Sequence, residues 1–185
     1  MNTQADILQR FLLQEGFQVP LEELWLDPQR QRVSAYCYLE CSDHVLMLRR
    51  NKEPFAGYWT APGGKLQFGE DPRQAVMREM NEETGLFVQA PSLRLVVAEI
   101  SPNPLYNWLL FVFRTSDASG QLRECQEGTL RWVPHRELAT LKKPTVDAHL
   151  LPLALEKKQR YVAHVSFHDP PEGMTVRTRV CGVEE

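Results

Sequence analysis

The segment 64–86 constrains this chain more than any other, because it predicts both a helix and the chemistry carried on that helix. Asp71 is a favourable helix cap, and Pro72 after it is pre-set for the first helical turn. Gly85 is of the residue type that often ends a helix, so we expect a helix over about 72–84. Three carboxylates then share one face within one turn, at positions i, i+3 and i+4: Glu79, Glu82 and Glu83.

A cluster of carboxylates near the C-terminal end of a helix is unfavourable by itself, because like charges repel and that end already carries partial negative charge. One interpretation is an acidic face that water solvates, and the other is a site that holds a cation. Carboxylate oxygens prefer hard cations, so the second interpretation predicts Mg2+, with Mn2+ as an alternative. The opposite side of the helix carries Ala75, Val76 and Met80, and we expect it to pack in the core.

The residues around these carboxylates match a longer pattern at every fixed position: G-x5-E-x7-R-E-U-x-E-E-x-G-U, with U aliphatic. The match begins at Gly64 and ends at Leu86. This pattern is the Nudix box, and the chain resembles the Nudix hydrolase family, with residues 55–86 similar to its MutT branch. The resemblance implies an α/β protein with the Nudix fold, in which a mixed β-sheet lies in an α/β/α sandwich.

The residues next to the predicted helix fit a phosphate site. Gly63, Gly64 and Lys65 follow a short strand-like run, and we expect a turn whose backbone approaches a phosphate or a metal closely. Lys65 would add a positive charge, while a plain glycine turn is the alternative. Arg78 is expected to pair with Glu70 and to orient the metal ligands; its alternative is an ordinary solvated arginine.

Two acidic residues further along the chain are assigned by the resemblance alone. MutT-like proteins have a glutamate, a metal ligand or base, shortly before a tryptophan of the next strand, and Glu127 has that place before Trp132. Vertebrate oxidised-purine-nucleotide hydrolases have an acidic residue that contacts the base, and Asp147 matches it. A helix cap is the alternative role for Asp147. An asparagine that contacts the base in those enzymes is Thr60 here.

The resemblance implies a metal-dependent hydrolase of a nucleoside diphosphate linked to another group. We expect a nucleoside triphosphate, such as 8-oxo-dGTP, to be cut to the monophosphate and pyrophosphate. A water molecule activated by Glu79 or Glu127 would attack phosphorus while Mg2+ neutralises the diphosphate. The expected metal ligands are Gly63, Glu79, Glu82, Glu83 and Glu127, and the expected substrate contacts are Gly64, Lys65, Thr60 and Asp147.

Other substrates and one other class of protein remain as alternatives. ADP-ribose, nucleotide sugars, dinucleoside polyphosphates and capped RNA ends belong to the same reaction class. A Nudix-fold ligand sensor without turnover is the alternative outside it. Such sensors usually lose carboxylates of the box, whereas this chain keeps Glu70, Glu79, Glu82 and Glu83, so we expect an enzyme.

Length and composition favour one globular domain with a sizeable core: the chain has 185 residues, of which 43% are hydrophobic. We expect an N-terminal helical extension over 1–30 and a Nudix hydrolase domain over 31–185. A net charge of -3 gives no footprint for long nucleic acid, and no segment resembles a secretory signal or a membrane span. The 4 cysteines favour reduced, mostly buried thiols in a cytoplasmic protein. The expected partner is a small nucleotide, and the expected assembly is a monomer or a homodimer.

Apolar patterning predicts interleaved strands and helices in the rest of the chain. An amphipathic helix is expected over 4–15; it packs on the domain, covers the site or serves a dimer. The expected strands are 32–41, 44–50, 88–100 with a break at Pro91–Ser92, 106–115, 130–133, 160–167 and 175–180. A loop is expected through 117–120, a short helix from Pro134 and a longer helix over 147–158.

Overall fold

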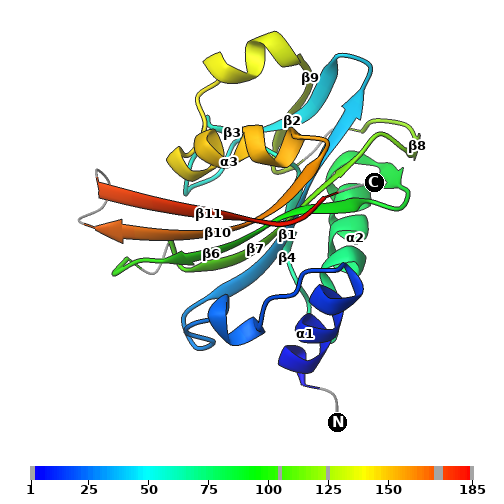
Figure 1. Cartoon of the computed structure of the whole chain (residues 1–185). Helices are drawn as coiled ribbons and strands as arrows, with labels where there is room; N and C mark the ends of the chain where they lie inside the picture. Colours follow the sequence, from blue (N-terminus) through cyan, green and yellow to red (C-terminus); the bar gives the residue numbers. More distant parts are fainter. Residues whose placement is uncertain (1–2, 104–105, 124–125, 169–172, 184–185) are drawn as a thin grey trace.

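The computed structural model describes residues 3–103, 106–123, 126–168 and 173–183. A large mixed β-sheet forms the middle layer, and helices pack on both of its faces (Figure 1). The predicted α/β/α arrangement is therefore confirmed.

Nine strands of the described chain form the main sheet. They are β1 (Arg32–Cys41), β2 (His44–Arg50), β3 (Trp59–Thr60), β4 (Gly63–Lys65), β6 (Ser92–Ile100), β7 (Trp108–Thr115), β9 (Gly128–Pro134), β10 (Gln159–His168) and β11 (Gly173–Val183). The order across the sheet is β11-β10-β6-β7-β1-β2-β3, with β4 beside β1 and β9 beside β2. β1 is parallel to β7 and β10 is parallel to β6, while the remaining pairs are antiparallel.

One face of the sheet is covered by α1 (Gln4–Gln14) and α2 (Pro72–Thr84), with the short 3-10 helix η1 (Leu21–Glu23) between them in the sequence. Phe11 of α1 packs edge-on against Phe111 of β7, with 5.9 Å between the ring centroids. The buried apolar residues of the two helices are Leu8, Phe11, Leu12, Ala75, Val76 and Met80. Of the three roles left open for the N-terminal helix, packing on the domain is the observed one.

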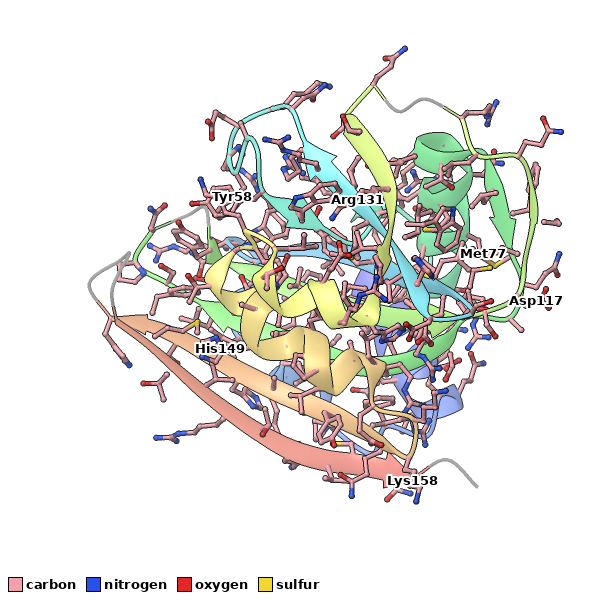
Figure 2. The ribbon with its side chains drawn as sticks, turned by 90° about the horizontal axis from the view of Figure 1, so that it is seen from above. Tyr58, Met77, Asp117, Arg131, His149 and Lys158 are labelled. Carbon is pink, nitrogen blue, oxygen red and sulfur yellow. The ribbon has the colours of Figure 1, made fainter. Side chains whose placement is uncertain are left out.

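The opposite face is covered by α3 (Thr145–Leu155) and the 3-10 helix η3 (His135–Thr140). Figure 2 looks down on this face and shows α3, marked by His149, lying across the strands. Its apolar residues share a second core with β6, β7 and β10: Val146, Leu150, Leu151 and Ala154. The sheet thus separates two cores, one under α1 and α2 and one under α3.

Two segments that were predicted as a turn and a loop are short strands. Residues 63–65 form β4, which pairs antiparallel with β1. Within 117–120, β8 (Ala118–Gly120) pairs antiparallel with β5 (Leu86–Val88). A strand of three residues is too short to show an apolar alternation. It forms because the neighbouring strand supplies its hydrogen bonds. Patterning along the chain therefore missed both.

α3 begins and ends before its predicted bounds of 147–158. Its N-cap is Pro144, and no side chain caps it. Asp147 lies within the first turn, so the helix-cap alternative for this residue is wrong. At the other end, the Glu156 carboxylate accepts hydrogen bonds from the backbone N–H groups of Lys158 and Gln159, at 2.9 and 2.6 Å. These bonds turn the chain out of the helix.

Three of the 4 cysteines belong to the described residues, and all three are free thiols. Cys37 is buried, whereas Cys41 is exposed and Cys181 is half-buried, so the prediction of mostly buried thiols is wrong. Cys125 lies outside the described residues. In the described part of the chain, none of the helices has the length and apolar character needed to cross a bilayer.

Candidate active site

α2 carries the predicted site, and both of its ends are held by local structure. At the N-terminal end the Asp71 carboxylate accepts hydrogen bonds from the backbone N–H groups of Arg73 and Gln74, at 2.8 and 2.9 Å. The side-chain oxygen of Gln74 accepts a hydrogen bond from the Asp71 N–H at 3.1 Å, which completes a capping box. At the other end, Gly85 takes a φ of 77°, in the left-handed region that glycine favours. The predicted bounds of this helix are confirmed.

Arg78 is the centre of an ion-pair network on α2. Its Nε and Nη2 atoms donate to the two carboxylate oxygens of Glu70, at 2.7 and 2.9 Å. Its Nη1 atom donates to Glu79 at 2.8 Å and to Glu82 at 3.2 Å. The hydrogen bond from Arg78 is the main cause that lowers the pKa of Glu70 below its usual range. The predicted pairing of Arg78 with Glu70 is confirmed, and the same guanidinium orients two further carboxylates.

The loop that carries Glu70 is held in place by the N-terminal helix. The side-chain amide of Gln4 donates to the Glu70 carbonyl at 2.9 Å and accepts from the Gly69 N–H at 3.0 Å. Nearby, Arg73 of α2 forms an ion pair with Glu15 at 2.5 Å. α1 therefore positions the partner of the arginine, besides filling the core.

Gly63 and Gly64 are glycines for two different steric reasons. The backbone of Gly63 has a φ of 145°, and a Cβ there would lie 2.3 Å from the carbonyl oxygen of Ala35 in β1. A Cβ on Gly64 would lie 2.6 Å from the carboxyl group of Glu79. The first glycine lets β4 pair closely with β1, and the second leaves room for a carboxylate of α2 against the strand.

Glu83 and Glu79 are carboxyl groups in partly dry, negatively charged surroundings. The backbone N–H of Gly63 donates to Glu83 Oε2 at 2.8 Å. Burial nevertheless raises the pKa of Glu83 to about 7, and the charges of Glu79 and Glu127 add to the rise. Burial also raises the pKa of Glu79, against the opposing effect of Arg78. A positive charge placed among these groups would relieve both effects.

The predicted carboxylates are suitable ligands for a divalent metal, but they are not already arranged around a common metal position. Their oxygen atoms are the donors that hard cations prefer. Among the residues that the structure describes, no three aspartate, glutamate, histidine or cysteine side chains are already arranged to hold a metal ion. Arg78 holds Glu79 and Glu82, and the Gly63 N–H holds Glu83. The donor set fits a divalent cation, which would share these carboxylates with their present hydrogen-bond donors.

A cavity of about 930 Å³ opens beside these carboxylates. The predicted site residues that line it are Gly64, Lys65, Glu79, Glu82, Glu83, Glu127, Thr60 and Asp147. Gly63 and Arg78 do not line the cavity, but each is hydrogen-bonded to a glutamate that does. Glu127 also pairs with Lys52 at 3.1 Å. The fold thus brings segments from β3 to α3 around one space.

Two more carboxyl groups line this cavity away from α2: Asp147 of α3 and Glu99 of β6. Burial raises the pKa of Glu99 well above its usual range, and the charge of Asp147 adds to the effect. Burial raises the pKa of Asp147 to about 7, although the positive charges of Lys143 and Arg50 oppose the rise. Apolar and aromatic side chains line the same cavity: Leu95, Leu110, Tyr106 and Phe167.

Arg50 of β2 interacts electrostatically both with Glu83 of α2 and with Asp147 of α3. It lines the cavity, and its Nε atom donates to the carbonyl of Pro54 at 3.1 Å. Its charge lowers the pKa of Glu83 on one side and of Asp147 on the other, in each case against burial. A cation in that place suits the phosphates or the sugar of a bound nucleotide.

Neither Glu99 nor Arg50 was among the predicted site residues. A signal for Glu99 does exist, because it follows Leu95 and Val97 on one face of an alternating strand, and these two are buried. A carboxylate on an otherwise apolar face is unusual and indicates a polar task. Arg50 has no comparable signal, since an arginine at the end of a strand is most often solvated.

The sequence and the fold of this chain are similar to those of known Nudix proteins. The family model of the NUDIX domain matches residues 28–154. The uncharacterized Nudix hydrolase YvcI of Bacillus subtilis is 34% identical over 146 residues, which cover 77% of this chain and 89% of that protein. The 8-oxo-dGDP phosphatase NUDT18 of Homo sapiens is 30% identical over 128 residues, 66% of this chain but 38% of the human protein. The crystal structure of the MutT protein from Bacillus halodurans matches with a TM-score of 0.70 at 26% identity, over 80% of this chain and 97% of that one.

Proposed function

The chain belongs to the Nudix hydrolase family, and from that membership we propose that it is a magnesium-dependent hydrolase of nucleoside triphosphates. The products would be a nucleoside monophosphate and pyrophosphate. One relative is named an 8-oxo-dGDP phosphatase, so we place guanine nucleotides, and 8-oxo-dGTP among them, first as substrates.

The observation that carries this proposal is a single cavity that joins the carboxylates of α2 to a buried region of acids and aromatic rings. A nucleoside triphosphate needs both, because its phosphates require a cation and its base requires apolar faces with a few polar groups. The cavity volume of about 930 Å³ lies within the range of roughly 300–1,000 Å³ typical of small-molecule sites. One nucleotide therefore fits the space with its two ends in matching surroundings.

The residues proposed to hold the cation are Glu79, Glu82, Glu83, Glu127 and the carbonyl of Gly63. The cation, Mg2+ or Mn2+, would supply charge neutralisation at the diphosphate as the P–O bond breaks. The chain itself does the rest. Glu79 or Glu127 would take the proton of the attacking water, and Arg78 keeps Glu79 in place. The exposed ammonium group of Lys65 would bind a phosphate oxygen.

Substrates with a free terminal phosphate are proposed over ADP-ribose, together with a site that is complete within one chain. Many ADP-ribose-type members of the family form their pocket across a domain-swapped dimer with a longer N-terminal β region. Here the described residues before β1 form α1 and η1 and include no strand. α1 is packed into the core, and the described residues that line the cavity extend from Arg32 to Phe167 of this chain. Activity should therefore persist in the monomer.

A nucleotide panel with Mg2+ tests the proposal: dGTP, 8-oxo-dGTP, dATP, 8-oxo-dGDP and ADP-ribose, with pyrophosphate and phosphate measured separately. We expect pyrophosphate from a triphosphate, loss of activity with a chelator and recovery when Mg2+ is restored. Phosphate released fastest from 8-oxo-dGDP would favour a diphosphate substrate, the second candidate that the human relative suggests. Faster cleavage of ADP-ribose than of every triphosphate would overturn the substrate assignment, and no product at all would indicate a ligand sensor.

A further inference from the structure

Glu99 is a buried carboxyl group that the proposed chemistry at phosphorus does not use. It lies on β6 on the same face as Leu95 and Val97, both of which belong to the core under α3. The residue is 5% exposed and contributes to the lining of the cavity. A side chain that costs free energy to bury has therefore been placed where a bound molecule would meet it.

No described residue hydrogen-bonds the carboxyl group of Glu99 or that of Asp147. The side-chain hydrogen bond that reaches Glu99 goes to its backbone carbonyl, from Gln31 at 3.3 Å. The ammonium group of Lys143, whose charge acts on Asp147, donates instead to the backbone carbonyls of Leu138 and Leu141. Glu99 is buried and Asp147 is half-buried, and carboxyl groups in such places gain most from a partner that donates hydrogen bonds, so the two indicate a ligand that brings donors with it.

The bases differ in how many adjacent donors one edge presents. The Watson–Crick edge of guanine carries two neighbouring donors, N1–H and N2–H, whereas adenine, cytosine and thymine each offer a single donor group next to an acceptor. Glu99 and Asp147 line one cavity and the charge of Asp147 acts on Glu99, so when ionised, as donors from a ligand favour, the two carboxyls form an acceptor-rich end of the cavity. That end matches a guanine-type edge and leaves acceptors unpaired against the other three bases. Oxidation of guanine at C8 does not change this edge.

We propose that Glu99 is a specificity-determining residue that accepts hydrogen bonds from N1–H and N2–H of a guanine-type base, with Asp147 beside it. The inference rests on the proposed function in placing the base of a nucleotide in this cavity. Tyr106 and Phe167 also line the cavity, with 4.8 Å between their ring centroids, and offer apolar faces to the ring. The carboxylates of α2 have a separate task at the phosphates.

Glu99→Gln tests this role, because the amide replaces one acceptor by a donor and keeps the shape. The amide can pair with the N6 donor and N1 acceptor of adenine, whereas it faces guanine with a mismatched donor. We expect the ratio of kcat/KM for dGTP to that for dATP to fall by about tenfold to a hundredfold, and the ratio for 8-oxo-dGTP to dATP to fall with it. Glu99→Met, which keeps the length and removes both polar atoms, should reduce the same ratios without favouring adenine.

Binding of dGMP and dAMP, measured by thermal shift without metal, gives a second readout that does not need turnover. The wild-type protein should be stabilised more by dGMP, and Glu99→Gln should lose that preference. Glu53→Gln is the matched control, because it removes a carboxylate from the same cavity lining at an exposed position. This variant should retain the preference for dGTP over dATP in kcat/KM and the preference for dGMP over dAMP in binding. Each variant at position 99 should fold, since it removes a buried ionisable group that has no partner among the described residues.

The two hypotheses fail separately in this design. A wild-type enzyme that hydrolyses triphosphates, with a guanine preference that Glu99→Gln leaves unchanged, would overturn the role of Glu99 and keep the proposed function. A protein that hydrolyses none of the nucleotides, yet binds dGMP over dAMP through Glu99, would overturn the proposed function and support the inference.

Discussion

Gly64 and Glu79 touch so closely that any side chain at position 64 would displace the carboxylate: a Cβ there would lie 2.6 Å from both Cδ and Oε1 of Glu79. The glycine belongs to β4 and the glutamate to α2, so this contact joins the strand to the helix at the site itself. It also separates a steric requirement from a conformational one, because Gly64 does not have the left-handed backbone that Gly63 and Gly85 have.

Gly64→Ala should therefore lower turnover while the protein stays folded. A displacement of a catalytic carboxylate by about 1 Å is enough to cost on the order of 10²-fold in rate. The measurement is kcat on the best triphosphate together with the melting temperature. Gly16→Ala is the control, because its φ of 75° should cost about 1–2 kcal/mol of stability, while a Cβ there would meet Arg160 and not Glu79, so kcat should be unchanged. Full activity in Gly64→Ala would show that the position of Glu79 is not critical.

Glu83→Gln and Glu79→Gln should each reduce turnover by about 10²–10⁴-fold without unfolding the protein. Glutamine at position 83 can still accept the hydrogen bond from Gly63, but it lacks the charge that a cation needs. Stability without metal should rise slightly, because the charge of Glu83 is repelled by Glu79 and Glu127. Kinetics in Mg2+ and chemical denaturation in a chelator give the two readouts. Near wild-type rates in either variant would remove that glutamate from the proposed metal ligands.

Arg50→Gln should raise KM for a triphosphate by roughly tenfold, the usual scale for losing one charge-assisted hydrogen bond. The expectation follows from the place of Arg50 in the cavity, where its charge acts on both Glu83 and Asp147. Arg49→Gln is the matched control on the same strand, since Arg49 is exposed and lies outside the cavity lining. Equal effects of the two substitutions would indicate a general loss of charge and no specific contact.

Asp147→Asn should change how stability depends on pH. Burial raises the pKa of Asp147 to about 7 in the folded protein, from 3.8 when unperturbed. Below about pH 4 the group is protonated in both states. As pH rises from about 4 to 7 only the unfolded state loses the proton, so folded stability falls, and above pH 7 the loss is complete.

The asparagine variant lacks this penalty. It should therefore be more stable than the wild-type protein at pH 8 by roughly 1–3 kcal/mol, with the difference shrinking toward pH 4. Urea unfolding at a series of pH values measures it. A difference that does not change with pH would mean that Asp147 is solvated and titrates normally.

The helix that carries the site was predictable because its signals are local. Asp71 and Pro72 begin it, Gly85 ends it, and the observed helix has those bounds. The pairing of Arg78 with Glu70 was also predictable, since the family pattern places both. Strands β1 and β2 were predictable for a similar reason: each has a long apolar run, and a turn separates them.

The positions of Glu99 and Asp147 at the cavity could not be predicted from the sequence, because they depend on how distant segments pack together. Alternation along β6 puts Glu99 on the face of Leu95 and Val97, but only the assembled fold shows that a cavity opens against that face. Asp147 was expected at a helix start, yet the helix begins before it and turns the carboxyl into the cavity. The roles of these residues, like those of Thr60 and Glu127, stay predictions.

The bond between Gln4 and the loop at Gly69 and Glu70 has a practical consequence for any experiment on this protein. Through Glu70, the amide of Gln4 is two contacts away from Arg78, although it stands almost at the start of the chain. An affinity tag joined in front of α1 therefore adjoins the helix that holds Glu70, the partner of Arg78. Rates measured on tagged and cleaved protein should be compared before any substitution in the cavity is interpreted.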